Sequence, residues 1–322
     1  MRIVLPRLLI AFCLCLASGL SVKAQTWPTR PINLVVGFGA GGNGDITARI
    51  FAEFLARELG QPVIVENRPG GGGIVAAIGV AKAAPDGYTI LVQAIGPAIL
   101  RPLMDPSVGY DSERDLSAIG LLSETPNVIL GGSKFPARSL QELVDWAKKN
   151  PGRLTVGHPG PGTMGHLGAL LLGSKAGITG TYIAYRSCGH MLPDLLGGQI
   201  DVGCAAYAPP FKSSHILAVM TAEPVDFLPG VPSMREAGFP SVIASTWYGV
   251  YGPPNMPAAI VTKLNAAMNS FLQSDEARSR FPGLGVQALG GPPEGLTKKM
   301  AEDKILWSKV INDAHVKMDD QK

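Results

Sequence analysis

Charged residues are scarce in this chain: they make up 16% of its 322 residues, and the formal net charge is +3. Three of the 28 basic residues are Arg2, Arg7 and Lys23. They lie within residues 1–24, which contain no acid, so the rest of the chain has 25 basic and 25 acidic residues. Nucleic-acid binding depends on a basic face that contacts phosphates. We therefore expect no nucleic acid among the partners of this protein.

Several features that would point to other classes of protein are missing as well. No run after residue 24 reaches the roughly 20 apolar residues that a membrane-spanning helix needs. The 40 glycines and 27 prolines follow no G-X-Y period, which excludes collagen and indicates many tight loops. The nucleophile motif G-x-S-x-G is absent. His158 and His166 have neither an acid nor a thiol between them, which argues against a metal site.

The sequence does contain what a sizeable folded core requires. Hydrophobic residues make up 46% of the chain, which excludes a disordered protein. A length of 322 residues fits about two ordinary domains.

Residues 1–24 have the pattern of an export signal. A basic start, Met1–Arg7, precedes an apolar run of 13 residues, Leu8–Leu20, which is too short to span a bilayer. The small residues near Ala24 predict cleavage between Ala24 and Gln25, so we expect an exported protein. After cleavage, the remaining cysteines are Cys188 and Cys204. They could form a disulfide or stay as two thiols, and their spacing does not decide between these states.

The chain that follows alternates strands and helices in two units. The first unit is expected to have strands at Ile32–Val36, Pro62–Val65 and Tyr88–Val92, with helices at about 46–59 and at Ile74–Ala84. The second is expected to have strands at Leu154–Val156, Tyr182–Tyr185 and Ile200–Ala206, with helices at Leu140–Lys149, His166–Lys175 and Met191–Leu196. Helices at 257–273 and 294–313 are expected to close the chain. This order is typical of an α/β protein with mainly parallel sheets flanked by helices.

A glycine-rich loop follows the first expected strand. Gly37, Gly39 and Gly42 spell G-x-G-x-x-G, the dinucleotide-binding fingerprint, and Glu66 could serve as the acid that binds the ribose. Asp45 lies in the first helical turn, where its charge would oppose a pyrophosphate, or where it could simply act as an N-terminal helix charge. In either case, a helix start with unpaired N–H groups can hold an anion.

A second loop of this kind, at 157–166, lies between a strand and a helix of the second unit. It contains Gly160 and Gly162, and Thr163 adds a hydroxyl. Thr163 could also be a plain N-cap, and His166 could cap the helix or orient the loop. If the two units face each other, the two loops would hold a small molecule that has a carboxylate at one or both ends.

Many further motifs resemble the extracytoplasmic solute-binding receptors of the tripartite tricarboxylate transporter family, the Bug or TctC-like proteins. The resemblance covers nearly the whole chain after residue 24. It is carried by Trp27-Pro28-Thr29-Arg30-Pro31-Ile32, Phe38-Gly39-Ala40-Gly41-Gly42, Glu66-Asn67-Arg68-Pro69-Gly70, Ala84-Pro85-Asp86-Gly87-Tyr88-Thr89, Asp194-Leu195-Leu196-Gly197-Gly198-Gln199 and Ser245-Thr246-Trp247-Tyr248-Gly249.

The resemblance implies a two-domain periplasmic binding protein of type II with a two-strand hinge near Asn127–Leu130 and Trp247–Val250. Domain 1 would comprise residues 25–127 and 246–322, and domain 2 would comprise 128–245. Such a receptor performs no chemistry and needs no cofactor. It would work in the periplasm as a monomer, trap a small carboxylate and deliver it to a two-component membrane permease. The ligand-binding residues that it implies are Ala40, Gly41, Gly42 and Asp45 in domain 1, with Gly160, Gly162, Thr163 and His166 in domain 2.

Departures from the family pattern bear on the ligand. Where the family has a hydroxyl-rich run, this chain has Gln93-Ala94-Ile95-Gly96-Pro97. Where members that bind amino acids carry an acid, it has Cys204-Ala205-Ala206-Tyr207. An apolar wall is a poor host for an unpaired ammonium group. We therefore expect a carboxylate without an amino group, either a di- or tricarboxylate or one with an aromatic or apolar body near Ile95 and Tyr207. Ala94, Ala205 and Tyr207 are accordingly expected among the ligand-binding residues.

Two further departures affect the cleft itself. The segment Ala205–Ile216 is several residues shorter than is usual in the family, and Gly37 replaces a proline. Either change could alter the cleft. Two alternatives to a transport receptor also stay open: a secreted α/β enzyme, for instance a dinucleotide-dependent one, and a receptor that signals to a membrane sensor.

Overall fold

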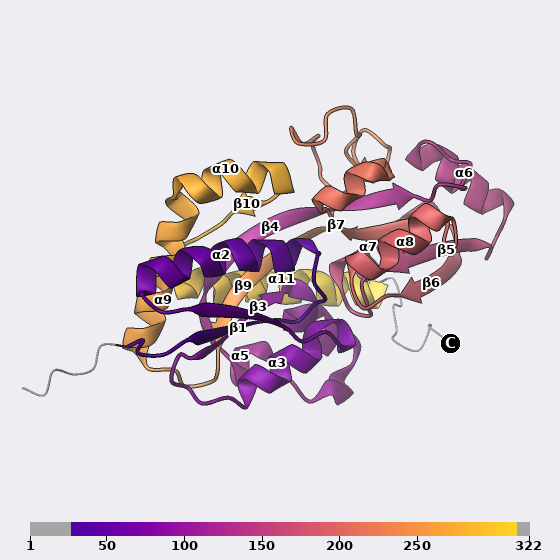
Figure 1. Cartoon of the computed structure of the whole chain (residues 1–322). Coiled ribbons are helices and arrows are strands. Elements are labelled where there is room, and N and C mark those ends of the chain that lie inside the picture. Colours follow the sequence, from indigo (N-terminus) through magenta and orange to yellow (C-terminus); the bar gives the residue numbers. More distant parts are fainter. Residues whose placement is uncertain (1–26, 314–322) are drawn as a thin grey trace, which may run out of the picture.

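The computed structural model describes residues 27–313, and Figure 1 shows that they form two α/β halves side by side. The predicted export signal and its cleavage site lie outside the described residues. Among residues 27–313, none of the helices has the length and apolar character needed to cross a membrane.

The first half contains three neighbouring parallel strands of a larger mixed sheet. β1 (Ile32–Val36) lies between β2 (Val63–Asn67) and β3 (Thr89–Ala94), and all three run in the same direction. Helices α2 (Asn43–Leu59) and α3 (Ile74–Ala81) make the crossovers between the strands. β1 is a run of apolar and β-branched residues that is almost wholly buried, as expected for a strand covered on both faces.

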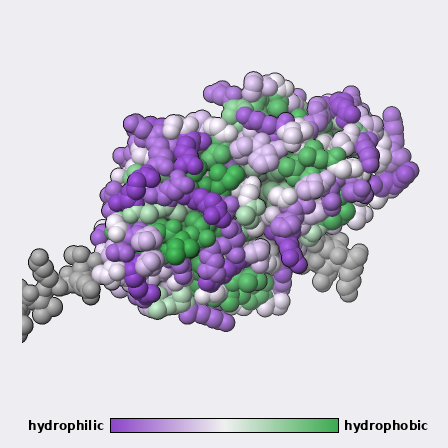
Figure 2. Space-filling model, in the orientation of Figure 1, coloured by the Kyte–Doolittle hydropathy of each residue, from purple (hydrophilic) through white to green (hydrophobic). Residues whose placement is uncertain are grey.

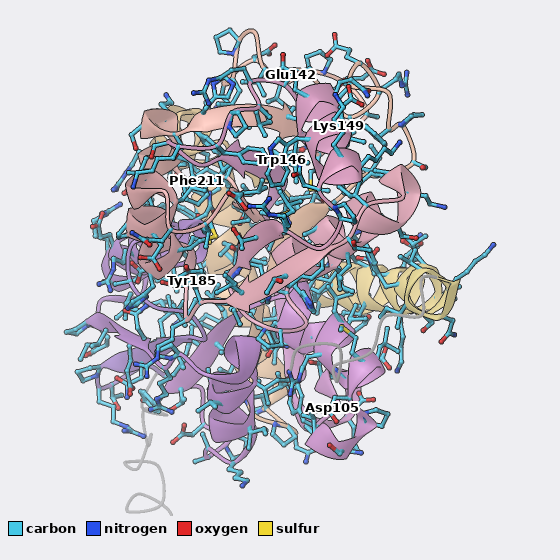
Figure 3. The ribbon with its side chains drawn as sticks, turned by 90° about the vertical axis from the view of Figure 1, so that its right-hand side faces the viewer. Asp105, Glu142, Trp146, Lys149, Tyr185 and Phe211 are labelled. Carbon is cyan, nitrogen blue, oxygen red and sulfur yellow. The ribbon has the colours of Figure 1, made fainter. Side chains whose placement is uncertain are left out.

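The second half repeats this arrangement. β5 (Leu154–His158) lies parallel to both β6 (Gly180–Ala184) and β7 (Val202–Ala206). Helices α7 (Met164–Ala176) and α8 (Cys188–Gly197) connect them, and α6 (Leu140–Lys149) precedes β5. In Figure 3 the α6 residues Glu142, Trp146 and Lys149 mark this half, and Asp105 marks the other. The predicted alternation of strands and helices is therefore confirmed in both halves.

The chain passes between the halves at two places. β4 (Ser117–Gly131) pairs with β9 (Ser245–Gly252) up to Pro126, and from Asn127 onward it pairs with β7 and with β8 (His215–Val219). The chain returns to the first half between Ala244 and Ser245, where the Asn127 amide donates to the Ala244 carbonyl oxygen at 3.1 Å. These passages lie close to the predicted domain limits. That the halves move as separate domains stays a prediction.

The C-terminal segment packs on the first half. It contains α9 (Ala258–Gln273), α10 (Asp275–Leu284), β10 (Gln287–Ala288) and α11 (Pro293–Asp313). The predicted closing helices correspond to α9 and α11, and α10 was not predicted. Trp247 Nε1 donates to Asp303 Oδ2 at 2.6 Å, which fixes α11 against β9.

Short elements complete the described chain. They are η1 (Gly71–Gly73), η2 (Gly96–Leu100), α4 (Arg101–Met104), η3 (Pro106–Val108), α5 (Ser112–Asp115) and η4 (Pro209–Ser213). Cys188 and Cys204 are both free thiols, so the disulfide that spacing had left open is absent. Figure 2 shows the surface as hydrophobic patches separated by hydrophilic residues.

Candidate ligand site between the two halves

A cavity of about 40 Å³ lies where the two halves meet. The first half contributes Phe38, Gly42, Asn43, Gly44, Asp45, Ala94, Gly96, Thr246 and Tyr248. The second half contributes Pro159, Thr163, Met164, Gly165, Ser187, Cys188 and Ala206. Of the described residues, those that border the cavity include no lysine, arginine or histidine, so any attraction for an anion must come from backbone amides and neutral polar side chains.

Three helices begin at this cavity. The first turns of α2, α7 and α8 all border it, because each helix follows a parallel strand of its half through a short loop. The first amides of a helix have no partner within the helix, and the helix dipole adds partial positive charge there. Helix starts from both halves therefore point their donors toward one small space, which suits an anionic group.

The start of α2 lacks a side-chain cap. Its N-cap is Gly42, whose carbonyl oxygen accepts from the Ile46 amide at 3.0 Å. A Cβ atom at Gly44 would lie 2.6 Å from Cε1 of Tyr248, so only glycine lets this ring lie against the first turn. Burial raises the pKa of Tyr248 above its ordinary value, which keeps the phenol neutral beside the cavity.

Asp45 holds the first glycine loop together. Its carboxylate accepts from the Gly41 amide at 3.0 Å, from Asn67 Nδ2 at 2.8 Å and from Arg49, whose Nη2 lies 2.9 Å away. Burial acts to raise the pKa of Asp45, but the hydrogen bonds from Arg49, Gly41 and Asn67 outweigh it and hold the pKa below its ordinary value. The charge of Asp45 is therefore already engaged within its own half.

The start of α7 is capped by Thr163. Thr163 Oγ1 accepts from the His166 amide at 3.3 Å and donates to the Gly160 carbonyl oxygen at 2.7 Å. His166 Nδ1 in turn accepts from the Gly162 amide at 3.3 Å. These bonds set the shape of the second glycine loop and satisfy the His166 amide, while Met164 and Gly165 of the same first turn border the cavity.

Two stacked histidines lie behind this loop. The rings of His158 and His166 are parallel to within 21°, with centroids 4.3 Å apart, and both side chains are buried. Burial lowers the pKa of His158 to about 4 and that of His166 to about 3. Both rings are thus neutral at physiological pH, and they support the loop without adding a charge.

The start of α8 was missed in the sequence. The expected helix began at Met191, but α8 begins at Cys188 with Ser187 as its N-cap. Ser187 Oγ lies 2.8 Å from His190 Nδ1, so its hydroxyl is engaged within the first turn. Burial raises the pKa of Cys188 to about 12, so this thiol is also neutral. The sequence feature that could have indicated this helix start is the strand–loop–helix order that also marked the other two helix starts.

The structure brings some of the predicted ligand-binding residues to the cavity and leaves others away from it. Gly42, Asp45, Ala94 and Thr163 border the cavity. The residues that do not border it are Ala40, Gly41, Gly160, Gly162, His166, Ala205 and Tyr207. Most of these shape the two loops rather than line the space between them.

Ala205 and Tyr207 lie on the other side of β7 from the cavity. Ala206 borders the cavity, and successive side chains of a strand point to opposite faces. Ala205 and Tyr207 instead belong to the buried cluster that contains Val128. On β7 the residue that borders this cavity is therefore Ala206, and ligand contacts of Ala205 and Tyr207 stay a prediction.

Backbone groups of the two halves touch around the cavity. A Cβ atom at Gly96 would lie 3.0 Å from the Gly162 carbonyl oxygen. At Gly72, where φ is +68°, it would lie 2.5 Å from the Pro161 carbonyl oxygen. At Gly72 a side chain would prevent this close approach, and at Gly96 it would be tightly crowded.

Glu66, the acid that the dinucleotide interpretation of the first loop would use to bind the ribose, is already paired in the structure. Both carboxylate oxygens of Glu66 accept from Arg68, at 2.7 and 2.8 Å. The hydrogen bonds from Arg68 lower the pKa of Glu66 below its ordinary value. Asp45 keeps its negative charge beside the same helix start.

Two α/β halves that are joined by crossover strands, with a cavity between them, define a periplasmic binding protein. Residues 47–315 match the family described as the tripartite tricarboxylate transporter family receptor, TctC. The chain belongs to this family, whose members are periplasmic binding receptors.

Similar proteins cover almost the whole chain. A UPF0065 protein of Bordetella bronchiseptica is 35% identical over 315 residues, which are 96% of this chain and 93% of that protein. The structure of Rhodopseudomonas palustris Rpa4515 with adipate has a TM-score of 0.87 and is 31% identical, covering 90% of this chain and 99% of that one. MatC from the same organism, with bound malate, has a TM-score of 0.84 and is 31% identical, covering 88% of this chain and 100% of that one.

Proposed function

We propose that this protein captures a small carboxylate between its two halves in the periplasm and delivers it to a two-component membrane permease. One observation carries the proposal: three helix starts, contributed by both halves, border one cavity without a basic side chain. Amide donors at helix starts bind carboxylates and leave the rest of the ligand unconstrained. Similar receptors with malate and with adipate support the same class of ligand.

The ligand is expected to lack an amino group. An ammonium group needs an acid partner, and Asp45, whose carboxylate already binds Arg49, is the single acid among the described residues that border the cavity. The remaining wall has apolar side chains, including Phe38, Met164 and Ala206. A di- or tricarboxylate, or a carboxylate with an aromatic or apolar body, fits these surroundings.

Capture requires the two halves to move. The cavity of about 40 Å³ is small and lies between touching backbones, so we infer that the halves separate at the crossovers to admit a ligand. A ligand that contacts helix starts in both halves favours the closed arrangement by its differential affinity for it.

The test is a thermal-unfolding screen of the chain from Gln25 against malate, adipate, citrate, benzoate, glutamate and NAD. A carboxylate present at 100 times its Kd should add about 2.7 kcal/mol of stability. Glutamate should have a much smaller effect than the best carboxylate without an amino group. Stabilisation by NAD alone would contradict the proposal and favour the dinucleotide-dependent alternative. N-terminal sequencing of the exported protein checks the predicted cleavage before Gln25.

A further inference from the structure

A second, larger hollow lies at the junction of the two halves. This groove has a volume of about 720 Å³, and the residues that define it here are Glu124, Pro126, Asp226, Phe227, Ser245 and Gly285. Glu124 and Pro126 belong to β4, Ser245 to β9, Asp226 and Phe227 to the loop after β8, and Gly285 follows α10. Figure 1 shows α10 and the loop after β8 on the same upper side of the molecule.

The groove lies on the opposite face of the crossover strands from the ligand cavity. On β9, Ser245 borders the groove and the next residue, Thr246, borders the cavity. Neighbouring residues of a strand point to opposite faces. One wall of the groove comes from the first half and the other from the second, so the width of the groove depends on the angle between the halves.

One side chain connects the two hollows. Asn43 borders the cavity, and its Nδ2 donates to the carbonyl oxygens of Tyr207, at 2.9 Å, and Leu284, at 3.2 Å. The ring of Tyr207 lies 5.1 Å from that of Phe227, which borders the groove. Gly285 follows Leu284 and also borders the groove. The start of α2 is thus in hydrogen-bond contact with residues next to both walls of the groove.

The groove carries negative charge that the protein does not neutralise. Within residues 27–313, neither Glu124 nor Asp226 forms an ion pair, and the groove is lined by no lysine or arginine. Glu124 accepts a hydrogen bond from Ser245 Oγ, and Asp226 is exposed. Between the two acids the lining is apolar and includes Phe227 and the partly exposed Ile243. This combination complements a segment in which a cationic side chain has apolar neighbours.

We propose that the groove is the surface by which a membrane subunit of the permease recognises the closed receptor, through a segment with a lysine or arginine between apolar side chains. The inference rests on the proposed delivery to a permease. A segment that contacts both walls binds best at one angle between the halves. The groove therefore lets the partner distinguish the closed protein from the open one without contacting the ligand.

Binding of the full chain from Gln25 to proteoliposomes that contain the two permease subunits of the same genome tests the proposal. Asp226→Arg and Glu124→Gln should each weaken binding at least tenfold, and raised salt should weaken binding of the unaltered protein. Glu58→Arg is the matched control, because Glu58 is an exposed acid at the other end of α2. Equal binding by Asp226→Arg and Glu58→Arg, or salt-independent binding, would overturn the proposal.

A second measurement locates the contact directly. We would label the variants Asp226→Cys and Glu58→Cys with a benzophenone maleimide and illuminate each with the same proteoliposomes. The unaltered chain, treated in the same way, shows how much crosslinking comes from the native cysteines. A crosslink to a permease subunit from position 226 but not from position 58 supports the proposal, and no crosslink from position 226 overturns it. Stabilisation by free L-arginine that Asp226→Arg removes would assign the groove to a small cation and would also overturn it.

The thermal screen separates this inference from the proposed function. If a carboxylate stabilises both Asp226→Arg and the unaltered chain, and both dock equally well, ligand capture and delivery stand and the docking surface is wrong. If no carboxylate stabilises the unaltered chain, the proposed function itself fails.

Discussion

Asn43 Nδ2 lies 2.9 Å from the backbone carbonyl oxygen of Tyr207, and this hydrogen bond joins the start of α2 to the end of β7 in the other half. Asn43 Oδ1 accepts from Thr125 Oγ1 of β4 and from Thr47 Oγ1, each at 3.2 Å. The side chain is buried and bonded on both sides. Asn43 thus connects the wall of the cavity, the crossover strand and the opposite half.

Asn43→Ala is expected to weaken both folding and ligand binding. The change leaves the buried carbonyl oxygen of Tyr207 and the Thr125 hydroxyl without this partner, which costs about 1–3 kcal/mol for unsatisfied buried groups. Chemical denaturation measures the loss, and small-angle scattering should show a less compact protein in the presence of the best carboxylate. Asn150→Ala is the control, because among the described residues Asn150 Nδ2 bonds only to the nearby Trp146 carbonyl oxygen. If both variants bind the carboxylate equally well, Asn43 does not couple the halves.

Thr163 provides a test of the second helix start. Thr163→Val keeps the shape but removes the hydroxyl that accepts from the His166 amide, so the unfolding free energy should fall by about 1 kcal/mol. The loop that presents the α7 amides should loosen, and the carboxylate-induced stabilisation should shrink. Thr163→Ser keeps the hydroxyl and should behave like the unaltered protein in denaturant titration and calorimetry. A Val variant that binds normally would place the ligand away from this loop.

The order of strands and helices could be predicted from the sequence, but the inner surface of the site could not. Apolar runs and glycine breaks marked the strand–loop–helix units, because these patterns follow from local burial and backbone geometry. Whether Ala206 or its neighbours face the cavity depends on the register of β7 against β4, which a short all-apolar run does not specify. Similarly, β4 spans both halves although no local feature marks Asn127 as the point where its pairing changes.

The early start of α8 had a similar cause. Ser187 is an ordinary N-cap residue, but its hydroxyl bonds to His190 and not to a backbone amide. The apolar periodicity begins only at Met191, so the pattern predicted a helix that starts too late. Asn43 was missed for another reason: its partners Tyr207 and Thr125 lie far away in the sequence.

The stacked histidines predict a loss of stability in mild acid. In the unfolded chain, His158 and His166 bind protons below their ordinary pKa of about 6.5. In the folded protein, burial lowers these pKa values to about 4 and about 3, so both imidazole rings stay neutral in the folded state. Between pH 6.5 and pH 4 the unfolded state therefore binds more protons, and stability falls as the pH falls.

The expected loss at pH 5 is on the order of 1–2 kcal/mol for each histidine relative to pH 7.5. Denaturant titration at pH 7.5, 6 and 5 measures it, and His158→Gln should reduce the slope. Asp45 does not contribute in this window: its pKa lies below 3.8 in the folded protein, so its contribution is lost only at lower pH. A stability that is constant between pH 7.5 and 5 would show that these histidines are protonated in the folded state.

Cys188 offers a way to fill the cavity by enlarging a side chain that borders it. Its side chain borders a space of about 40 Å³, so the ring in Cys188→Phe should occupy the volume that the carboxylate group needs. The variant should fold, because Cys188 is only partly buried, but its melting temperature should no longer respond to any carboxylate of the panel. Cys188→Ser keeps the size of the side chain and should retain the response. A ligand at 100 times its Kd stabilises the protein by about 2.7 kcal/mol if its site is intact. A Phe variant that still gains this much at 100 times the original Kd would therefore show that the ligand binds outside this cavity.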